Sequence, residues 1–330
     1  WQHKPRTVRR RSVMAGFKNL KENPPVEEEA VEEVASVTPP SPTSGGSIWG
    51  EIQSAANEVT ESAVFCGIIG HEGTCKTGIV LDSIKDDENI LIVDFDNGGK
   101  TLRSSYYRDK MHNIRALNPW VFQKGTRDAV HYPNTHQRVI DIMNEAVDWA
   151  ERQKQPDYTG PKLGTVLVTA LDPWDTVAKN CMFIEDLGTA PDGIGAKVKP
   201  HEKVGMRFNW QIRSTRFHML TALWRQLMSQ GVRVFVETHL KEEYDGHKPS
   251  GEYKPDWEKQ MGNYLHQIVC MHKTPVRDDT GAKTGEVRYE AEFHKWRTNS
   301  DLVDQRRTVM VTQTGKPAQW HGLPELRGEI

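Results

Sequence analysis

Residues 70–77 of the chain read Gly70-His71-Glu72-Gly73-Thr74-Cys75-Lys76-Thr77. They follow directly on an apolar run that ends at Ile69, and they precede Gly78 and a second apolar run. A glycine-bearing turn between a strand and a helix aims backbone N–H groups at an anion, and the start of the helix adds a partial positive charge. The segment therefore has the order of a Walker A motif, and we expect residues 70–78 to surround the phosphates of a nucleotide.

Three side chains of this segment have specific expectations. The ammonium group of Lys76 would reach the β- and γ-phosphates, and the hydroxyl of Thr77 would ligate Mg²⁺. Cys75 stands where the motif usually has glycine, so its side chain either points away from the phosphates or narrows the site. Its place beside Lys76 at a helix N-terminus is of the kind that lowers a thiol's pKa, which predicts a reactive thiol that nucleotide protects. The alternative is a buried, inert thiol.

The next apolar run, residues 89–95, is followed by an acidic residue. A carboxylate at the carboxyl end of the strand after the phosphate loop faces the crevice in which nucleotides bind. We therefore expect Asp96 to orient or deprotonate the attacking water, as a general base within hydrogen-bond reach. The alternative is a turn-forming role ahead of residues 97–99, Asn-Gly-Gly. Asp94 shares the face of the strand and is the second choice.

A third apolar run, residues 165–171, is the expected Walker B strand. The usual position of its acid is held by Thr169, and the next acid is Asp172. We expect either that Asp172 supports Mg²⁺ from slightly further along, or that Thr77 and phosphate hold the metal. Asp175 is a weaker candidate, and a solvated turn is the alternative for both acids.

A fourth apolar run, residues 232–238, is followed by His239, which could report the presence of the γ-phosphate. A capping or core histidine is the alternative. Lys241, Lys295 and Arg297 could supply positive charge to the phosphates of their own or a neighbouring subunit. Arg297 is favoured among them, because a guanidinium can grip phosphate oxygens in a bidentate way.

Short apolar runs that alternate with amphipathic patterns predict an α/β domain. Because the first four strands are nearly continuous apolar runs, we expect a mostly parallel sheet with helices on both faces. Expected further elements are helices around residues 139–149 and 217–227, a strand at 266–271, loops at 188–200 and 244–255, and β-structure at 287–293 and 308–312.

The composition limits the protein class. The chain has 330 residues, a formal net charge of −2 and a hydrophobic share of 36%, which suffices for one large domain with appendages. Neither a membrane-spanning run nor a secretory signal is visible, and the four cysteines form no C-x-x-C pair. A cytoplasmic protein without membrane partners is expected.

The first 57 residues differ in character from the rest. A basic segment, an acidic segment and a run rich in Pro, Ser, Thr and Gly follow one another. Such a composition buries too little apolar surface to fold, so residues 1–57 are predicted to be a disordered, charge-segregated arm and residues 58–330 the folded domain. The basic part is either a nucleic-acid tether, a targeting sequence or a solvated tail.

The order of these features resembles that of the RecA-like, AAA-type P-loop ATPases encoded by phages, and most of all the single-strand annealing ATPases. The resemblance spans residues 63–271 and includes the phosphate loop, the strand ending in an acid, the Walker B strand, a helix with Trp210 and Arg216, and a strand ending in Thr238-His239. It implies a RecA-like core, ATP and Mg²⁺ as cofactors, single-stranded DNA and further copies of the chain as partners, and a role in phage recombination or replication in the host cytoplasm.

The resemblance also assigns roles to residues. Lys76 and Thr77 match the phosphate and metal residues, Asp96 matches the catalytic carboxylate, and His239 matches the γ-phosphate sensor. Cys75 and Thr169 depart from the pattern, and these departures bear on hydrolysis more than on nucleotide binding.

Two other functions remain open from the sequence. One is a nucleotide-dependent scaffold or switch with little turnover. The other is a packaging-type motor, which ranks lower because no nuclease-like cluster of carboxylates follows the core. Since the core is not basic, DNA contacts are expected from the arm or from local loops, such as the one that carries Lys197, Lys199, Lys203 and Arg207.

Overall fold

The computed structural model describes residues 64–98, 112–123, 129–188 and 203–327, with the side chains of 203–209 left aside. The strands are β1 (Phe65–Gly70), β2 (Glu88–Val93), β3 (Ile114–Leu117), β4 (Lys162–Val168), β5 (Arg233–Asp245), β6 (Lys248–Pro255), β7 (Gln267–Arg277), β8 (Lys283–Trp296), β9 (Arg306–Gln313) and β10 (Gln319–Trp320). The helices are α2 (Lys76–Asp82), α4 (Tyr132–Arg152), α5 (Leu171–Cys181), α6 (Lys203–Ser229) and α7 (Met261–Tyr264), with the short helices η2 (Met182–Asp186), η5 (Ser300–Leu302) and η6 (Pro324–Arg327). None of the helices in these ranges is long and apolar enough to cross a membrane.

Within the described residues, the strands form one mixed sheet in the order β10-β9-β8-β7-β1-β5-β4-β2-β3, and β6 pairs with β5 at its far end. The strands from β7 to β3 in this order are parallel, whereas β8, β9 and β10 continue the sheet in antiparallel pairs. The predicted α/β class with a mostly parallel sheet is confirmed. The carboxyl ends of the parallel strands therefore meet at one edge, where the loops after β1, β2, β4 and β5 come together.

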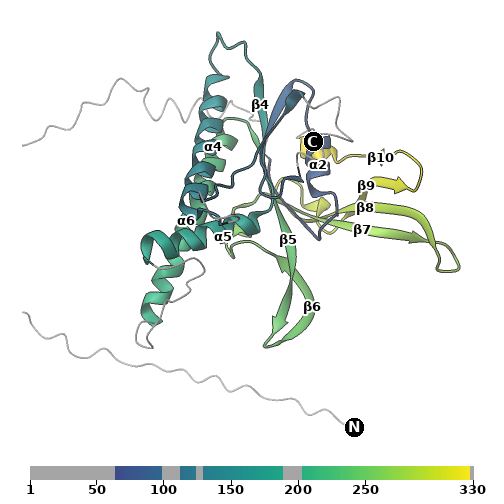
Figure 1. Ribbon diagram of the computed structural model, residues 1–330. Coiled ribbons are helices and arrows are strands. Elements are labelled where there is room, and N and C mark those ends of the chain that lie inside the picture. Colours follow the sequence, from purple (N-terminus) through teal and green to yellow (C-terminus); the bar gives the residue numbers. More distant parts are fainter. Residues whose placement is uncertain (1–63, 99–111, 124–128, 189–202, 328–330) are drawn as a thin grey trace, which may run out of the picture. The chain divides into compact units, whose positions relative to one another are not determined.

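Helices cover both faces of the sheet, but unequally (Figure 1). The layer of α4, α5 and α6 covers one face and includes the buried rings of Trp174, Phe217 and Trp224. On the other face, α2 and the C-terminal turn η6 contribute residues such as Ile79 and Leu326. β1 is buried along its whole length, as expected of a central strand between two layers.

Two predicted boundaries were wrong. The expected loop at 244–255 is a β-hairpin, in which β5 runs on to Asp245 and pairs with β6. Its tip is the two-residue loop Gly246-His247, and Gly246 has a φ of 66°, the positive φ that the first position of a tight hairpin turn requires. The expected strand at 165–171 ends at Val168, and α5 begins at Leu171, so Asp172 lies in the first turn of a helix. The arm of residues 1–57 and most of the loop 188–200 lie outside the described residues.

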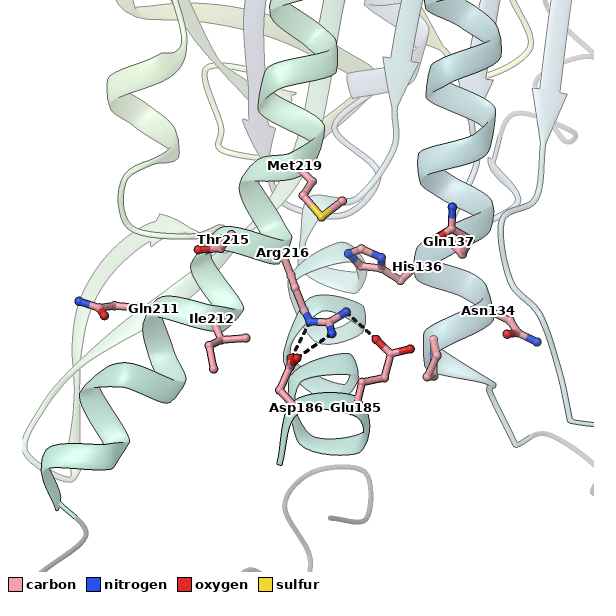
Figure 2. Close-up of a pocket in the computed structure, with 11 residues that line it drawn as sticks. Asn134, His136, Gln137, Glu185, Asp186, Gln211, Ile212, Thr215, Arg216 and Met219 are labelled. Carbon is pink, nitrogen blue, oxygen red and sulfur yellow. Dashed lines mark hydrogen bonds and ion pairs between the residues drawn. The ribbon is translucent and has the colours of Figure 1, made fainter. Parts of the chain in front are cut away.

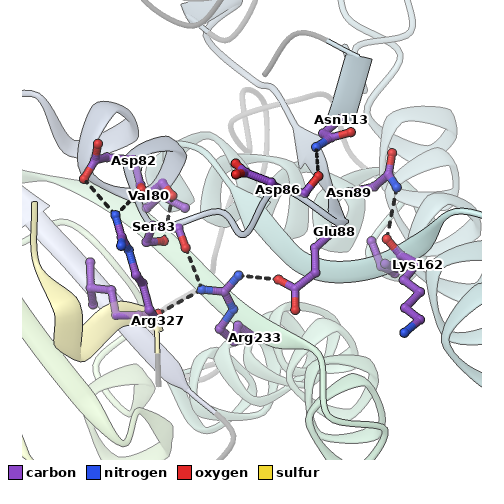
Figure 3. A network of polar contacts seen from close by, with 12 residues as sticks. Val80, Asp82, Ser83, Asp86, Glu88, Asn89, Asn113, Lys162, Arg233 and Arg327 are labelled. Atoms are coloured by element: carbon purple, nitrogen blue, oxygen red, sulfur yellow. Dashed lines mark hydrogen bonds and ion pairs between the residues drawn. The ribbon is translucent and has the colours of Figure 1, made fainter. Parts of the chain in front are cut away.

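A buried arginine fixes the amino ends of the strands, opposite the phosphate-loop edge (Figure 3). Arg233, at the start of β5, donates to the carbonyls of Ser83 at 2.9 Å and Leu326 at 3.1 Å, and pairs with the carboxylate of Glu88 at 2.7 Å. It joins the end of α2, the start of β2 and η6. Because α2 follows the phosphate loop directly, this network also holds the loop's supporting helix against the sheet.

Candidate functional site

The loop between β1 and α2 borders a cavity of 190 Å³ at the carboxyl edge of the sheet. Its lining combines residues of the loop and of the start of α2 with residues that follow β2 and β4 and residues within β5: Glu72 to Gly78, Asp96, Ala170, Glu237 and His239. A side chain on Gly70 would lie 2.7 Å from the Met271 carbonyl and 2.7 Å from the Thr74 hydroxyl, so only glycine fits there. The sequence therefore identified most of one cavity, from segments far apart in the chain.

Lys76 is the cation of this cavity. It is buried, and its Nζ donates to the carbonyls of Gly70 and His71, each at 3.1 Å. Burial lowers the pKa of its ammonium group, while Glu237, Asp172 and Asp96 favour the charged form. An ammonium held inside the turn of the loop is placed to meet an anion that the loop surrounds.

Cys75 adopts a backbone conformation that glycine tolerates better than other residues. Its φ of 69° and ψ of 32° lie in the left-handed region, and Gly73 has the same φ of 69°. This conformation costs an ordinary residue roughly 1–2 kcal/mol. The expectation of a reactive thiol was wrong, because burial, with Glu237 and Asp82 nearby, raises the pKa of Cys75 to about 12.

Glu237, near the middle of the long strand β5, is a site residue that the sequence reasoning missed. Its side chain is buried, and Oε2 accepts a hydrogen bond from the Thr77 hydroxyl at 3.0 Å. Burial raises the pKa of Glu237 to about 8, against the opposing influence of Lys76 and of the hydrogen bond from Thr77. The available signal was a carboxylate inside an otherwise apolar run, Val-Phe-Val-Glu.

The two acids after β2 have different surroundings. Asp96 is exposed and lines the cavity, and its Oδ1 also accepts the Gly98 N–H at 3.0 Å. It thus combines the expected position with the turn contact that was the alternative. Asp94 is fully buried, and its backbone N–H donates to the Leu117 carbonyl at 2.9 Å. Asp96 is therefore the acid of this pair that an incoming water can reach.

The end of β4 carries no metal-supporting acid. The Thr169 hydroxyl accepts the Phe95 N–H at 3.0 Å and donates to the Val93 carbonyl at 3.3 Å, which ties β4 to β2. Asp172 instead lies beside His239, with Oδ1 3.3 Å from Nδ1 of the imidazole. Asp175 pairs with Arg213 at 3.2 Å and does not line this cavity. Two of the predicted residues, Asp172 and His239, are thus brought together as a pair.

The cations named from the sequence do not converge on this cavity. Lys241 pairs with Asp256, the Nζ of Lys295 donates to the Gly262 carbonyl at 2.8 Å, and Arg297 donates to the Asn263 carbonyl at 2.9 Å.

The strand register places Arg297 at the opposite edge of the sheet. Trp296 lies opposite Gln267, which is level with Cys66 in β1. That position is about 13 Å along the strand from Gly70. Arg297 therefore lies at the end of the strands remote from its own phosphate loop and does not line the cavity.

The sequence reasoning also missed Lys273 on β7. Its Nζ lies 3.9 Å from the point at which a Cβ on Gly73 would stand. It is exposed, and its ammonium lies 5.8 Å from the centre of the Tyr289 ring. Lys273 follows Met271, the residue level with Gly70, so β7 places this cation over the loop.

A larger cavity of 760 Å³ lies elsewhere, between α4, η2 and α6 (Figure 2). Its one arginine, Arg216, forms ion pairs at 2.8 Å with both Glu185 and Asp186. Because these carboxylates neutralise the guanidinium, this cavity offers no cation to a phosphate. Among the described residues, no group of three or more His, Cys, Asp or Glu side chains could hold a metal ion.

No protein-family model matches the sequence, and no curated protein matches it significantly. The chain is similar to a solved structure described as the RadB recombinase, with a TM-score of 0.37 and 14% sequence identity. The similarity covers 78% of this chain and 91% of the recombinase chain. A likeness this distant assigns no function, which therefore rests on the geometry of the site.

Proposed function

We propose that the protein binds ATP with Mg²⁺ at the phosphate loop, hydrolyses it, and acts on single-stranded DNA. The observation that carries the proposal is the position of Lys76, whose ammonium is held inside a glycine-bearing loop by the carbonyls of Gly70 and His71. Phosphates that enter the loop would replace these two carbonyls as partners of the ammonium, a charge-assisted contact stronger than the one lost.

The residues around the loop suit a magnesium ion. Mg²⁺ prefers oxygen ligands, and in phosphate-loop sites it is held by one hydroxyl and by the nucleotide itself. Thr77 provides that hydroxyl in this chain, and the ion would neutralise charge on the transferring phosphoryl group. A site of this kind needs no cluster of several protein carboxylates.

Asp96 and His239 are the proposed residues for the hydrolytic step. Asp96 is exposed and lines the cavity, so its carboxylate can accept a proton from the attacking water. His239 borders the same cavity, and Asp172 at 3.3 Å orients its ring. Lys273 adds a second cation from the same subunit.

The β5–β6 hairpin is the proposed contact for single-stranded DNA. Tyr244 and Tyr253 on this hairpin are 63% and 53% exposed, which leaves two aromatic faces for stacking with bases. Tyr253 also contacts His71 of the phosphate loop, with ring centroids 4.8 Å apart. Because β5 carries Glu237 and His239 as well, a base stacked on the hairpin would be coupled to the nucleotide through one continuous strand.

Stacking on these rings is testable by substitution. Base stacking on an aromatic side chain contributes about 1–3 kcal/mol, so Tyr244→Ala should weaken single-stranded DNA binding roughly 5- to 100-fold in a fluorescence anisotropy titration. Tyr244→Phe keeps the ring and should bind as the wild type does. Equal affinities for the alanine and wild-type proteins would move the DNA contact away from the hairpin.

A switch that binds ATP with little turnover is the second candidate. Thr169 favours it, since the usual Walker B acid is replaced by a hydroxyl that bridges two strands. Measuring ATP turnover with and without single-stranded DNA separates the two. We expect turnover to rise with DNA; tight ATP binding with no turnover in either condition would establish the switch.

A further inference from the structure

The most unusual feature of the phosphate-loop cavity is a buried carboxylate directly beneath it. Glu237 is opposite Ile68 in β1, two residues before the loop begins, and the preceding residue Val236 pairs with Val168 in β4. Glu237 is 2% exposed, yet it borders the cavity. Burying a carboxylate is costly unless polar partners compensate, so its retention here calls for such partners.

The two carboxylate oxygens of Glu237 differ in their contacts. Oε2 accepts the Thr77 hydroxyl at 3.0 Å, whereas Oε1 is buried without a hydrogen-bond partner among the described residues. A hydroxyl has one proton and two lone pairs. Because the Thr77 hydroxyl donates its hydrogen bond to Glu237, both lone pairs of that hydroxyl remain available to a cation. The second carboxylate oxygen of Glu237, Oε1, can accept a hydrogen bond from a water molecule.

The neighbouring strand explains why this acid is needed. The position expected to hold the acid is Thr169, the residue after Val168, and its hydroxyl is committed to β2. Val168 and Val236 are paired, so Thr169 and Glu237 are neighbours on adjacent strands. The carboxylate of Glu237 therefore lies on β5, one strand away from the expected Walker B position after β4, and still borders the cavity of the phosphate loop.

We propose that Glu237 is the acid that supports Mg²⁺ in this chain, in place of an acid at Thr169 and in preference to Asp172. It is a positioning residue: it orients the Thr77 hydroxyl toward the ion and accepts a hydrogen bond from a water that the ion holds. Asp172 is less suited, since it lies in the first turn of α5 and its carboxylate pairs with His239. The assignment rests on the proposed function, since the ion enters with the nucleotide.

The test is the Mg²⁺ dependence of nucleotide binding, which needs no turnover. Fluorescent ATP is titrated into the full chain in EDTA, and the complex is then titrated with Mg²⁺, and with Mn²⁺ followed by electron paramagnetic resonance. In Glu237→Gln, the amide oxygen still accepts the hydrogen bond from the Thr77 hydroxyl, but the side chain can no longer ionise when the metal ion enters. We expect its half-saturating metal concentration to rise about 10- to 100-fold. Binding in EDTA should remain as tight as in the wild type, because the hydrogen bond with Thr77 is kept and burial already favours the uncharged form of Glu237 when no cation is bound.

Two control variants complete the experiment. Asp172→Asn should leave the half-saturating metal concentration unchanged. Glu237→Asp should have a half-saturating metal concentration between those of the wild type and Glu237→Gln. An unchanged metal dependence in Glu237→Gln, or a rise confined to Asp172→Asn, overturns the assignment while leaving ATP binding intact. A wild-type protein that binds no nucleotide in either EDTA or Mg²⁺ rejects the proposed function, and this assignment with it.

Discussion

At the scale of single residues, Cys75 shows how the backbone of the loop constrains the side chains it carries. The residue adopts a φ of 69°, which glycine would adopt without strain. The remaining loop contacts place Lys76 inward, so the conformation is retained although the glycine is absent. The strain of a Cβ in the left-handed region therefore lowers the stability of the folded protein.

Replacing Cys75 should expose this penalty. Cys75→Gly removes the Cβ, and we expect it to be about 1 kcal/mol more stable than Cys75→Ala, after the greater entropy of an unfolded glycine is allowed for. Both variants lose the thiol, so the difference between them isolates the backbone term. Chemical denaturation monitored by circular dichroism measures it, and equal stabilities would show that the loop relaxes around the cysteine.

The residues that could be predicted are those whose role follows from a short motif. Lys76, Thr77 and Asp96 line one cavity because each comes shortly after a parallel strand, and His239 joins them because the parallel pairing of β5 with β1 ends there. Glu237 could not be predicted in the same way, since its importance depends on which strand lies next to β1. That neighbour is β5, and strand order is a property of the assembled sheet rather than of any local sequence.

At the scale of elements, the layer of α4, α5 and α6 contains a buried histidine. His136 on α4 is 5% exposed, and its ring stacks on Trp174 of α5 with centroids 4.9 Å apart. Burial, and then Arg216, lower its pKa, while the carboxylates of Glu185 and Asp186 act in the opposite direction. The neutral form of this histidine is thus the one that the helical layer accommodates.

The stability of this layer should depend on pH. Above the unfolded-state pKa of about 6.5, His136 is neutral in both states and has no effect. Below it, the unfolded chain takes up a proton first, so the free energy of unfolding falls as the pH drops toward the lower folded-state pKa. The pKa of His272, which lies on β7 outside this layer, is also lowered, so it too makes the free energy of unfolding of the protein fall as the pH drops.

Urea denaturation at pH 7.5 and pH 5.5 tests this point. The loss of stability between the two pH values should be smaller in His136→Phe than in the wild type, because the group that takes up the proton is gone. Phe keeps a ring against Trp174, which limits the loss of packing. The same loss of stability in both proteins would exclude His136 as its source.

The elements themselves were predictable to different degrees. The central strands are continuous apolar runs, and α4 has apolar residues at spacings of three and four. The residues that set the pattern of α4, including Val139, Met143 and Ala146, are buried. The β5–β6 hairpin was missed because β6 is exposed along nearly its whole length, so no apolar alternation marks it. Only Gly246, the first residue of the turn, signalled it, and a lone glycine after an acidic residue also occurs in loops.

At the scale of the whole molecule, two cations other than Lys76 that could contact phosphates, Lys273 and Arg297, lie at opposite ends of the strands. The ammonium of Lys273 lies close to its own loop, whereas Arg297 lies at the remote end of the strands, where it could act only on the site of another copy of the chain. A positive charge donated across an interface can raise phosphoryl transfer about 10³-fold or more. If DNA aligns copies of the chain, hydrolysis should therefore depend on assembly.

Turnover assays at several protein concentrations distinguish the two cations. Lys273→Ala should lower turnover at every concentration, because it acts within one subunit. Arg297→Ala should remove only the part that grows with protein concentration and DNA length, a part that should also fall with salt as phosphate contacts are screened. Full DNA-stimulated activity in Arg297→Ala would show that this arginine does not serve a neighbour's site.

The claim on which all of this rests is that the loop around Lys76 binds the phosphates of ATP, and a calorimetric titration of Mg-ATP tests it most directly. We expect one site in the wild type, and at least roughly 30-fold weaker binding in Lys76→Ala, since a contact between an ammonium and phosphate contributes about 2–3 kcal/mol. Lys162→Ala, at the opposite edge of the sheet, should bind as the wild type does, and all three proteins should have the same circular dichroism spectrum. ATP affinity that is unchanged in a folded Lys76→Ala protein would contradict the account.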